Sequence, residues 1–261
     1  MMNIRFSLLA LILSLATPLS LSAQDEFRMD WGPVLKAPNN SGMQKVFGYN
    51  DDGFYALRLK PTSDFSSAKV YFEQYDRELN LKKSNPVKLK HKGKEVQYVD
   101  LLPLGGKFHF LTSYFNKSHK KNYLFVQEVL PRQLQPSQRM RMIAELPSYN
   151  MFKEGNFGIR TSEDSSYILI HAQTPERKND PEQFAFYVYD RNFEQIWKRQ
   201  VRLPYPGKQF SVEDVQVDEQ GNVYVLGVVY QDGTRVRRQG KPNYQYVVIA
   251  YREQGENKVE Y

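Results

Sequence analysis

Carboxylates in acidic pairs are the residues that most resemble a chemical site in this sequence. The pairs are Asp51–Asp52, Glu163–Asp164 and Asp218–Glu219. Calcium loops also use neighbouring carboxylates, but none of these pairs has the Asp-x-Asp-x-Asp-Gly order of such a loop. Each pair stands between two apolar-alternating runs, where a turn needs a side-chain acceptor. We therefore interpret the pairs as turn residues and predict no metal site.

An Asp-Arg dipeptide occurs in "YDREL" (75–79) and again in "YDRNF" (189–193), where it could act as a catalytic couple. Both dipeptides end a run of alternating apolar residues. A turn aspartate accepts hydrogen bonds from backbone N–H groups, and the arginine beside it is solvated or pairs locally. The dipeptides therefore indicate turns rather than chemistry.

Nucleophiles and zinc ligands follow no catalytic pattern. The chain has no cysteine, which excludes disulfides, thiol catalysis and cysteine-based zinc sites. The histidines His91, His109, His119 and His171 form no His-Glu-x-x-His motif, and no Gly-x-Ser-x-Gly is present. We predict no cofactor.

Three further carboxylates could face one another across a channel. Asp100, Glu213 and Asp214 lie in apolar-alternating runs. Carboxylates about 5–9 Å apart on either side of a glycosidic bond can hydrolyse it. A carbohydrate-active hydrolase or lyase is therefore our alternative function.

The elements that must position these residues recur along the chain at intervals of roughly 53–62 residues, which is the signature of a repeat architecture. One marker is "YDREL", followed by "LPRQL" (130–134), "YDRNF" and "YREQG" (251–255). A second marker consists of "NDDGFYALRL" (50–59), "LGGKFHFLTSYF" (104–115), "EDSSYILIHAQ" (163–173) and "DEQGNVYVLGVVY" (218–230). The two markers together define four units.

Each unit contains four runs with the period-2 alternation of strands, which we name a to d in order. The predicted strands are 44–50, 54–60, 68–76 and 85–90; 95–102, 107–115, 122–130 and 139–146; 157–162, 167–173, 184–190 and 197–203; 212–218, 222–230, 244–252 and 257–261. Such units predict an all-β β-propeller with about four four-stranded blades. The blades cover about 43–90, 94–147, 156–204 and 211–261.

The stretch 30–38, "DWGPVLKAP", is similar to a d strand. It predicts either a four-bladed ring closed by this strand or the N-terminal part of a larger ring. The lysines of "PVKLKHKGKE" (86–95) alternate with apolar residues, so we place them on an exposed edge strand, where lysine discourages pairing with another sheet.

The segment "DEQGNVYVLG" resembles the Asp-x-x-Gly-Asn-apolar-Tyr-apolar-x-Gly element of secreted bacterial β-propeller repeat proteins. The resemblance covers the fourth unit well and the other three loosely. It implies the propeller fold without implying an activity, because these repeats are of uncharacterised function.

Residues 1–23 have the pattern of a secretory signal peptide: Arg5, then an uncharged apolar run, then small residues before "QDEF". We expect cleavage after Ser22 or Ala23, which leaves the propeller domain at 24–261. No later run reaches the ~18 apolar residues of a spanning helix. The mature protein is therefore predicted to be periplasmic or extracellular, without an integral membrane segment.

The formal net charge is +7, and the positive excess falls in the predicted d–a and b–c loops, whereas the a–b turns are acidic. In a propeller these two sets of loops lie on opposite faces, so we predict one basic face that attracts anions. Its candidate ligand-binding residues are Lys117, Lys120, Lys121, Tyr149, Tyr205, Lys208, Arg235, Arg237, Arg238, Lys241 and Tyr244. The predicted function is non-catalytic binding of an anionic polysaccharide, an envelope polymer or an acidic protein surface. Export disfavours nucleic acid as the partner.

Overall fold

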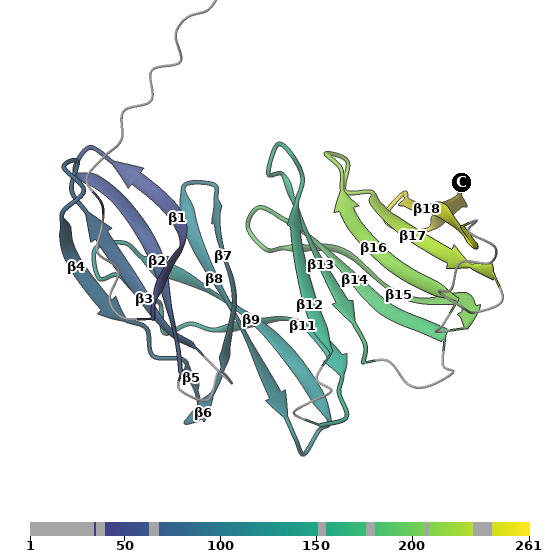
Figure 1. Ribbon diagram of the computed structural model, residues 1–261, viewed down its shortest axis with the longest axis horizontal. Coiled ribbons are helices and arrows are strands. Elements are labelled where there is room, and N and C mark those ends of the chain that lie inside the picture. Colours follow the sequence, from purple (N-terminus) through teal and green to yellow (C-terminus); the bar gives the residue numbers. More distant parts are fainter. Residues whose placement is uncertain are drawn as a thin grey trace, which may run out of the picture. The chain divides into compact units, whose positions relative to one another are not determined.

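The computed structural model describes residue 34 and residues 40–62, 68–150, 155–175, 181–206, 209–231 and 242–261 (Figure 1). Leu35–Tyr261 forms one compact unit, and the fold below belongs to it. The expected signal peptide lies outside the described residues, as does the expected strand at 30–38 apart from Val34.

Four of the five antiparallel sheets in the described residues have four or five strands and follow one another along the chain, each with its strands paired nearly in sequence order. Blade 1 consists of β1 (Gly42–Asn50), β2 (Gly53–Pro61), β3 (Ala68–Tyr75) and β4 (Leu81–Pro86). Blade 2 consists of β7 (Gln97–Leu104), β8 (Lys107–Asn116), β9 (Lys121–Leu130) and β11 (Arg141–Pro147), and the short β10 (Gln135–Pro136) also pairs with β9.

Blade 3 consists of β12 (Asn156–Thr161), β13 (Tyr167–Gln173), β14 (Pro181–Asp190) and β15 (Gln195–Pro206). Blade 4 consists of β16 (Phe210–Val217), β17 (Val223–Tyr230), β18 (Tyr244–Arg252) and β19 (Asn257–Glu260). No α-helix occurs in the described ranges. The predicted fold class, an all-β propeller of about four four-stranded blades, is confirmed by these four-stranded meanders.

One strand was predicted in the wrong place. The expected strand at 85–90 is β4 (Leu81–Pro86), and the lysine run continues into a separate hairpin of β5 (Lys90–His91) and β6 (Lys94–Glu95). Lys92 and Gly93 turn this hairpin with positive φ. Because Leu81 to Ser84 are all exposed, β4 has no apolar alternation, whereas the alternating Val87 and Leu89 lie between β4 and β5.

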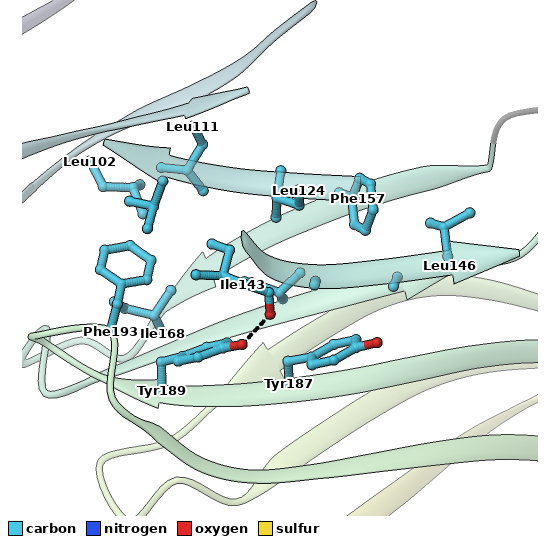
Figure 2. Packing of buried hydrophobic residues seen from close by; sticks show 14 of the residues in the cluster. Leu102, Leu111, Leu124, Ile143, Leu146, Phe157, Ile168, Tyr187, Tyr189 and Phe193 are labelled. Atoms are coloured by element: carbon cyan, nitrogen blue, oxygen red, sulfur yellow. Dashed lines mark hydrogen bonds between the residues drawn. The ribbon is translucent and has the colours of Figure 1, made fainter. Parts of the chain in front are cut away.

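The core consists of three apolar clusters, one at each interface between consecutive blades. Period-2 alternation sends neighbouring residues of one strand to different clusters. Ile168 and Ile170 of β13 pack against blade 2, whereas Leu169 between them packs against blade 4. Figure 2 shows the cluster between blades 2 and 3. Each blade is therefore buried on the faces that it turns to its neighbours.

The turn aspartates have the role that the sequence predicts. Asp76 accepts a hydrogen bond from the Asn80 N–H at 2.7 Å, and Asp190 accepts bonds from the Asn192 and Glu194 N–H groups at 2.9 and 2.8 Å. Asp218 likewise accepts the Asn222 N–H at 2.8 Å. These bonds hold the tight turns that set the register of each hairpin.

Candidate functional site

Two of the three candidate catalytic carboxylates lie directly after a β-bulge in the first strand of a blade. The register shifts between Tyr98 and Asp100 in β7, and between Val212 and Asp214 in β16. Each carboxylate accepts a hydrogen bond from the next backbone N–H, at 2.7 Å for Asp100 and 2.8 Å for Asp214. The bulge thus fixes the side chain against its own backbone.

Each of these aspartates also meets a cation from the first strand of the preceding blade. Lys45 Nζ lies 3.2 Å from Asp100 Oδ1, and an Arg160 nitrogen lies 3.3 Å from Asp214 Oδ1. Hydrogen bonds from Gln216, the Val215 N–H and Arg160 lower the pKa of Asp214. A general acid of a glycosidase needs a raised pKa, so this environment favours an interblade ion pair over proton donation.

Glu213 differs from the two aspartates. It is the extra residue of the β16 bulge, it is exposed, and it forms no ion pair with a described residue. It lines one cavity with Asp214, whereas Asp100 meets Lys45 at the interface between blades 1 and 2. The structure therefore groups two of the three candidates and places the third at a different interface.

The predicted lysines at the β8–β9 turn share one hairpin. Lys117 and Lys120 are exposed and form no ion pair with the part of the chain that is described. Lys121 donates to Glu145 Oε1 at 2.6 Å, and this hydrogen bond raises the pKa of Lys121. The hairpin therefore presents two lysines that form no ion pair with described residues and one lysine that is paired.

The predicted aromatic residues lie on separate blades. Tyr149 follows β11 in blade 2. Tyr205 in blade 3 stacks on Phe210 and donates its hydroxyl to Glu260 at 2.6 Å, which raises the pKa of Tyr205 to about 12. Tyr244 begins β18 of blade 4 beside Tyr230. The remaining predicted residues, Lys208, Arg235, Arg237, Arg238 and Lys241, lie outside the described residues.

A cavity of about 360 Å³, which we call the Arg139 cavity, lies between blades 2 and 3. Its charged lining residues are Lys107, Glu128, Arg139, Arg141, Arg191 and Glu194. Lys107 lies 3.2 Å from Glu128, and Arg141 lies 3.3 Å from Glu194. Arg139 is exposed and forms no ion pair with a described residue. After both carboxylates are paired, the positive charges of Arg139 and Arg191 remain, and Arg191 also donates a hydrogen bond to Ser166 Oγ at 3.2 Å.

A second cavity between the same blades, of about 530 Å³, is called here the Lys121 cavity. Lys121 lines it together with Lys198 and Arg199 of β15, and Glu145 is its acidic residue. Arg199 lies over the Tyr251 ring, with its Cζ 5.7 Å from the centroid. The Arg199 guanidinium thus lies against blade 4. Lys121 and Lys198 are therefore the cations of this cavity, against Glu145, and both cavities of this interface suit anionic groups.

Hydroxyl groups fix the two blades that form these cavities. Tyr187 donates its hydroxyl to the Glu145 carbonyl at 2.8 Å, and Tyr189 donates to the Ile143 carbonyl, as Figure 2 shows. Burial raises the pKa of both phenols. Strand β11 therefore docks on a row of tyrosines of β14, and the cavities lie beside this contact.

The sequence prediction missed most of the cations in the two cavities. Arg139 and Arg141 belong to "RMRMIAEL", and Lys198 and Arg199 belong to "WKRQVRL", both of which we had predicted to be fourth strands. The sequence carried no signal for them, because Lys198 and Arg199 are adjacent in the chain and Arg139 precedes β11. No group of three or more His, Asp or Glu side chains that could hold a metal occurs among the described residues. The described residues also form no helix that is long and apolar enough to cross a membrane.

No family model matches the sequence, and no curated protein matches it either. The fold is similar to the β-propeller domain of the trilobed protease from Pyrococcus furiosus, at 11% identity and a TM-score of 0.42 over 87% of this chain. It is similar to a thermostable family-43 glycoside hydrolase, at 12% identity and a TM-score of 0.41 over 82% of this chain. An endo-arabinase from Bacteroides thetaiotaomicron shows 9% identity and a TM-score of 0.41 over 78% of this chain.

This chain spans 58% of the chain that contains the protease propeller and 72% of each of the two others. At these identities the similarity concerns the fold alone and carries no activity over to this chain.

Proposed function

We propose that the protein is an exported, non-catalytic β-propeller that binds an anionic polysaccharide along the interface of blades 2 and 3. Export rests on the signal-peptide pattern of residues 1–23. The polymer's carboxylate or sulfate groups enter the Arg139 and Lys121 cavities, and no covalent step takes place.

The observation that carries this proposal is the excess of cations along one interface. The two cavities together present Lys107, Lys121, Arg139, Arg141, Arg191 and Lys198, against Glu128, Glu145 and Glu194. Two cationic cavities on one interface suit a long repeating anion better than a single small one, because charges spaced along one polymer can occupy both without a second association step. Arginine adds specificity, since its planar group binds a carboxylate or sulfate through two parallel hydrogen bonds.

The exposed lysines of the β8–β9 turn extend this surface. Lys117 and Lys120 lie four positions and one position before Lys121 in the chain and form no ion pair with described residues. Exposed charges of this kind mainly accelerate encounter and are screened by salt. The residues that the sequence predicted therefore contribute one part of the proposed surface, and the cavity cations contribute the rest.

The test is a binding measurement on the mature protein with polygalacturonate, dextran sulfate and neutral dextran at 50 and 300 mM salt. We expect both polyanions to bind, neutral dextran not to bind, and affinity to fall with salt. The double variant Arg139→Gln/Arg191→Gln should weaken binding by roughly tenfold. Each substitution removes one solvent-exposed ion pair with the polymer, which contributes about 0.5–1 kcal/mol to the free energy of binding.

The matched control is Lys88→Gln/Lys90→Gln, which removes the same charge from the region of the β5–β6 hairpin. This control should bind nearly as well as the wild type. Equal losses in both double variants would show that net charge alone drives binding, and the proposed surface would then be wrong. Binding to poly-glutamate but to no polysaccharide would replace the glycan with an acidic protein as the partner.

The alternative, glycoside hydrolysis by first-strand carboxylates, can be measured with the same preparation. Release of reducing ends from neutral or anionic polysaccharides, abolished by Glu213→Gln, would establish the enzyme and overturn the non-catalytic proposal. The ion pairs of Asp100 and Asp214, and the lowered pKa of Asp214, are the observations that favour binding.

A further inference from the structure

A third cavity, of about 310 Å³, lies between blades 3 and 4, and we call it the His171 cavity. Its polar residues come from β12 and β13 on one side and from the β16 bulge on the other. They are Asn156, Arg160, His171, Gln173, Glu213 and Asp214. A volume near 300 Å³ is at the lower end of small-molecule sites, which corresponds to a ligand of about one ring.

His171 is the residue that points to a ligand. Only 9% of it is exposed, and its buried Nε2 has no hydrogen-bond partner. Burial lowers the pKa of His171 to about 4, so the imidazole is neutral in ordinary solution. A buried polar atom without a partner costs about 1–3 kcal/mol. A site that retains such an atom gains when a hydroxyl group reaches it. Because this Nε2 has almost no accessible surface, the imidazole must turn toward the cavity for that contact to form.

The charges of the cavity exclude an anionic ligand. Its one cation, Arg160, is already paired with Asp214 at 3.3 Å. Glu213 is exposed at the rim and forms no ion pair within the described ranges. The lining therefore has one uncompensated negative charge, which repels carboxylates, sulfates and phosphates.

Gly158 leaves room beside Cβ and Nδ1 of His171. It pairs with His171 across β12 and β13. A Cβ added at Gly158 would meet His171 Cβ at 3.8 Å and Nδ1 at 3.9 Å, with nothing closer. Asn156 and Gln173 are also paired across these two strands and line the same cavity. The cavity lining thus offers hydrogen-bond donors and acceptors from side-chain amides, a carboxylate and a neutral imidazole. Among its described residues it offers no unpaired cation.

We propose that the His171 cavity binds a neutral polyhydroxylated ring, either a free monosaccharide or the terminal sugar of a glycan. Each hydroxyl group both donates and accepts, so the several hydroxyl groups of one ring can bond to His171 in either tautomer, to the Asn156 amide and to Glu213. Val212 and Val215 supply apolar contact to C–H groups of the ring. This site is distinct from the cationic cavities between blades 2 and 3, and its chemistry is opposite to theirs.

The test uses the mature protein with labelled histidine and follows the His171 imidazole signals by NMR, which His171→Gln identifies. The probes are the methyl glycosides of glucose, galactose and mannose, myo-inositol, and the anionic methyl glucuronide. We expect at least one neutral probe to shift the His171 signals with saturation in the millimolar range, and the glucuronide to leave them unchanged.

Gly158→Ala is the variant that separates binding from folding. The added methyl group enters the cavity at ordinary contact distance and requires no backbone change. It should weaken the neutral probe at least tenfold while the unfolding midpoint stays the same. Gly42→Ala, in β1 of blade 1, is the matched control: an added Cβ there meets no atom within 4 Å, so this variant should leave the binding intact.

Three outcomes would overturn the proposal. The first is that no neutral probe shifts the His171 signals, which would leave a cavity that holds water only. The second is equal binding of the glucuronide, which would contradict the exclusion of anions. The third is a probe affinity that Gly158→Ala does not change.

A further comparison distinguishes the two sources of the ring. If a β-linked disaccharide binds more tightly than the methyl glycoside of the same sugar, the ligand is the end of a glycan. If the two bind equally, the ligand is the free sugar. None of these results depends on polyanion binding between blades 2 and 3.

Discussion

The interface of blades 2 and 3 and that of blades 3 and 4 bury similar apolar side chains but differ in the charges around them. Both apolar clusters contain fully buried leucine, isoleucine or valine from the second strand of a blade. The cavities of the first interface have an excess of cations, whereas the cavity of the second has one arginine and two carboxylates. The apolar clusters thus stabilise both interfaces in the same way, whereas the cavities beside them differ in the ligands that they suit.

Blade 3 takes part in both interfaces, so the difference comes from the two faces of the same strands. In β13, Ile168 and Ile170 face blade 2, and Leu169 faces blade 4. His171 lies two residues after Leu169, so its side chain is on the same face of the strand, and it lines the cavity on the blade 4 side. One repeat can therefore present a cationic site and a neutral polar site without a change of fold.

The largest expected effect tests whether the two apolar interiors are equivalent. Leu111 on β8 and Leu169 on β13 are both completely buried, one in each interface. Leu111→Ala and Leu169→Ala should each lower the free energy of unfolding by about 2–5 kcal/mol, because each leaves a cavity. Chemical denaturation gives both values. A loss below about 1 kcal/mol for Leu169→Ala alone would contradict the equivalence.

The dependence of stability on pH should be dominated by the second interface. The pKa of His171 is lowered from 6.5 to about 4 in the folded protein. The unfolded chain therefore binds more protons between pH 6.5 and 4, and stability falls as the pH falls through this window. The expected loss is up to about 3 kcal/mol, and none of it occurs above pH 6.5.

Denaturation of the wild type and His171→Gln across this window measures the effect. The variant should lose less stability than the wild type between pH 6.5 and 4. His109→Gln is the corresponding change in the first interface, where burial also lowers the pKa of His109. Parallel curves for the wild type and His171→Gln would show that His171 does not contribute.

The hydroxyl groups between blades 2 and 3 should have an intermediate effect. Tyr189→Phe leaves the buried Ile143 carbonyl without the donor that Figure 2 shows. We expect a loss of about 1–2 kcal/mol in the free energy of unfolding. The corresponding bond of the second interface runs from Trp197 Nε1 to the Gly221 carbonyl at 3.0 Å. Trp197→Phe should cost more, because it also removes ring volume; the reverse order in thermal or chemical unfolding would count against this account.

The smallest effects should come from the interblade ion pairs. Arg141 and Glu194 in the first interface, and Arg160 and Asp214 in the second, are both 3.3 Å apart and partly exposed. Glu194→Gln and Asp214→Asn should each cost about 0.2–1 kcal/mol at low salt and less at high salt. Unfolding at two salt concentrations provides the comparison. A salt-independent loss above about 2 kcal/mol at either site would mean that the carboxylate supports more than an ion pair.

Repetition and alternation made most of the fold predictable from the sequence. Strands β13 and β18 match the predicted ranges residue for residue, since both alternate between turns marked by aspartate, glycine or serine. Strand β4 was misplaced because its exposed residues have no pattern. Of the candidate site, the sequence pointed to Lys121 and Asp214, which line cavities, but it gave no indication that Arg139 or His171 would.

What the sequence determined by itself is local and periodic: four units, four strands in each, aspartates in the turns, and two faces to every strand. These follow from turn chemistry and the period of two, which act between neighbours in the chain. The tertiary structure alone decided which side chains of consecutive blades meet. Arg139 and Arg191 belong to different blades, as do His171 and Asp214. Their shared cavities depend on packing between sheets, which no local pattern specifies.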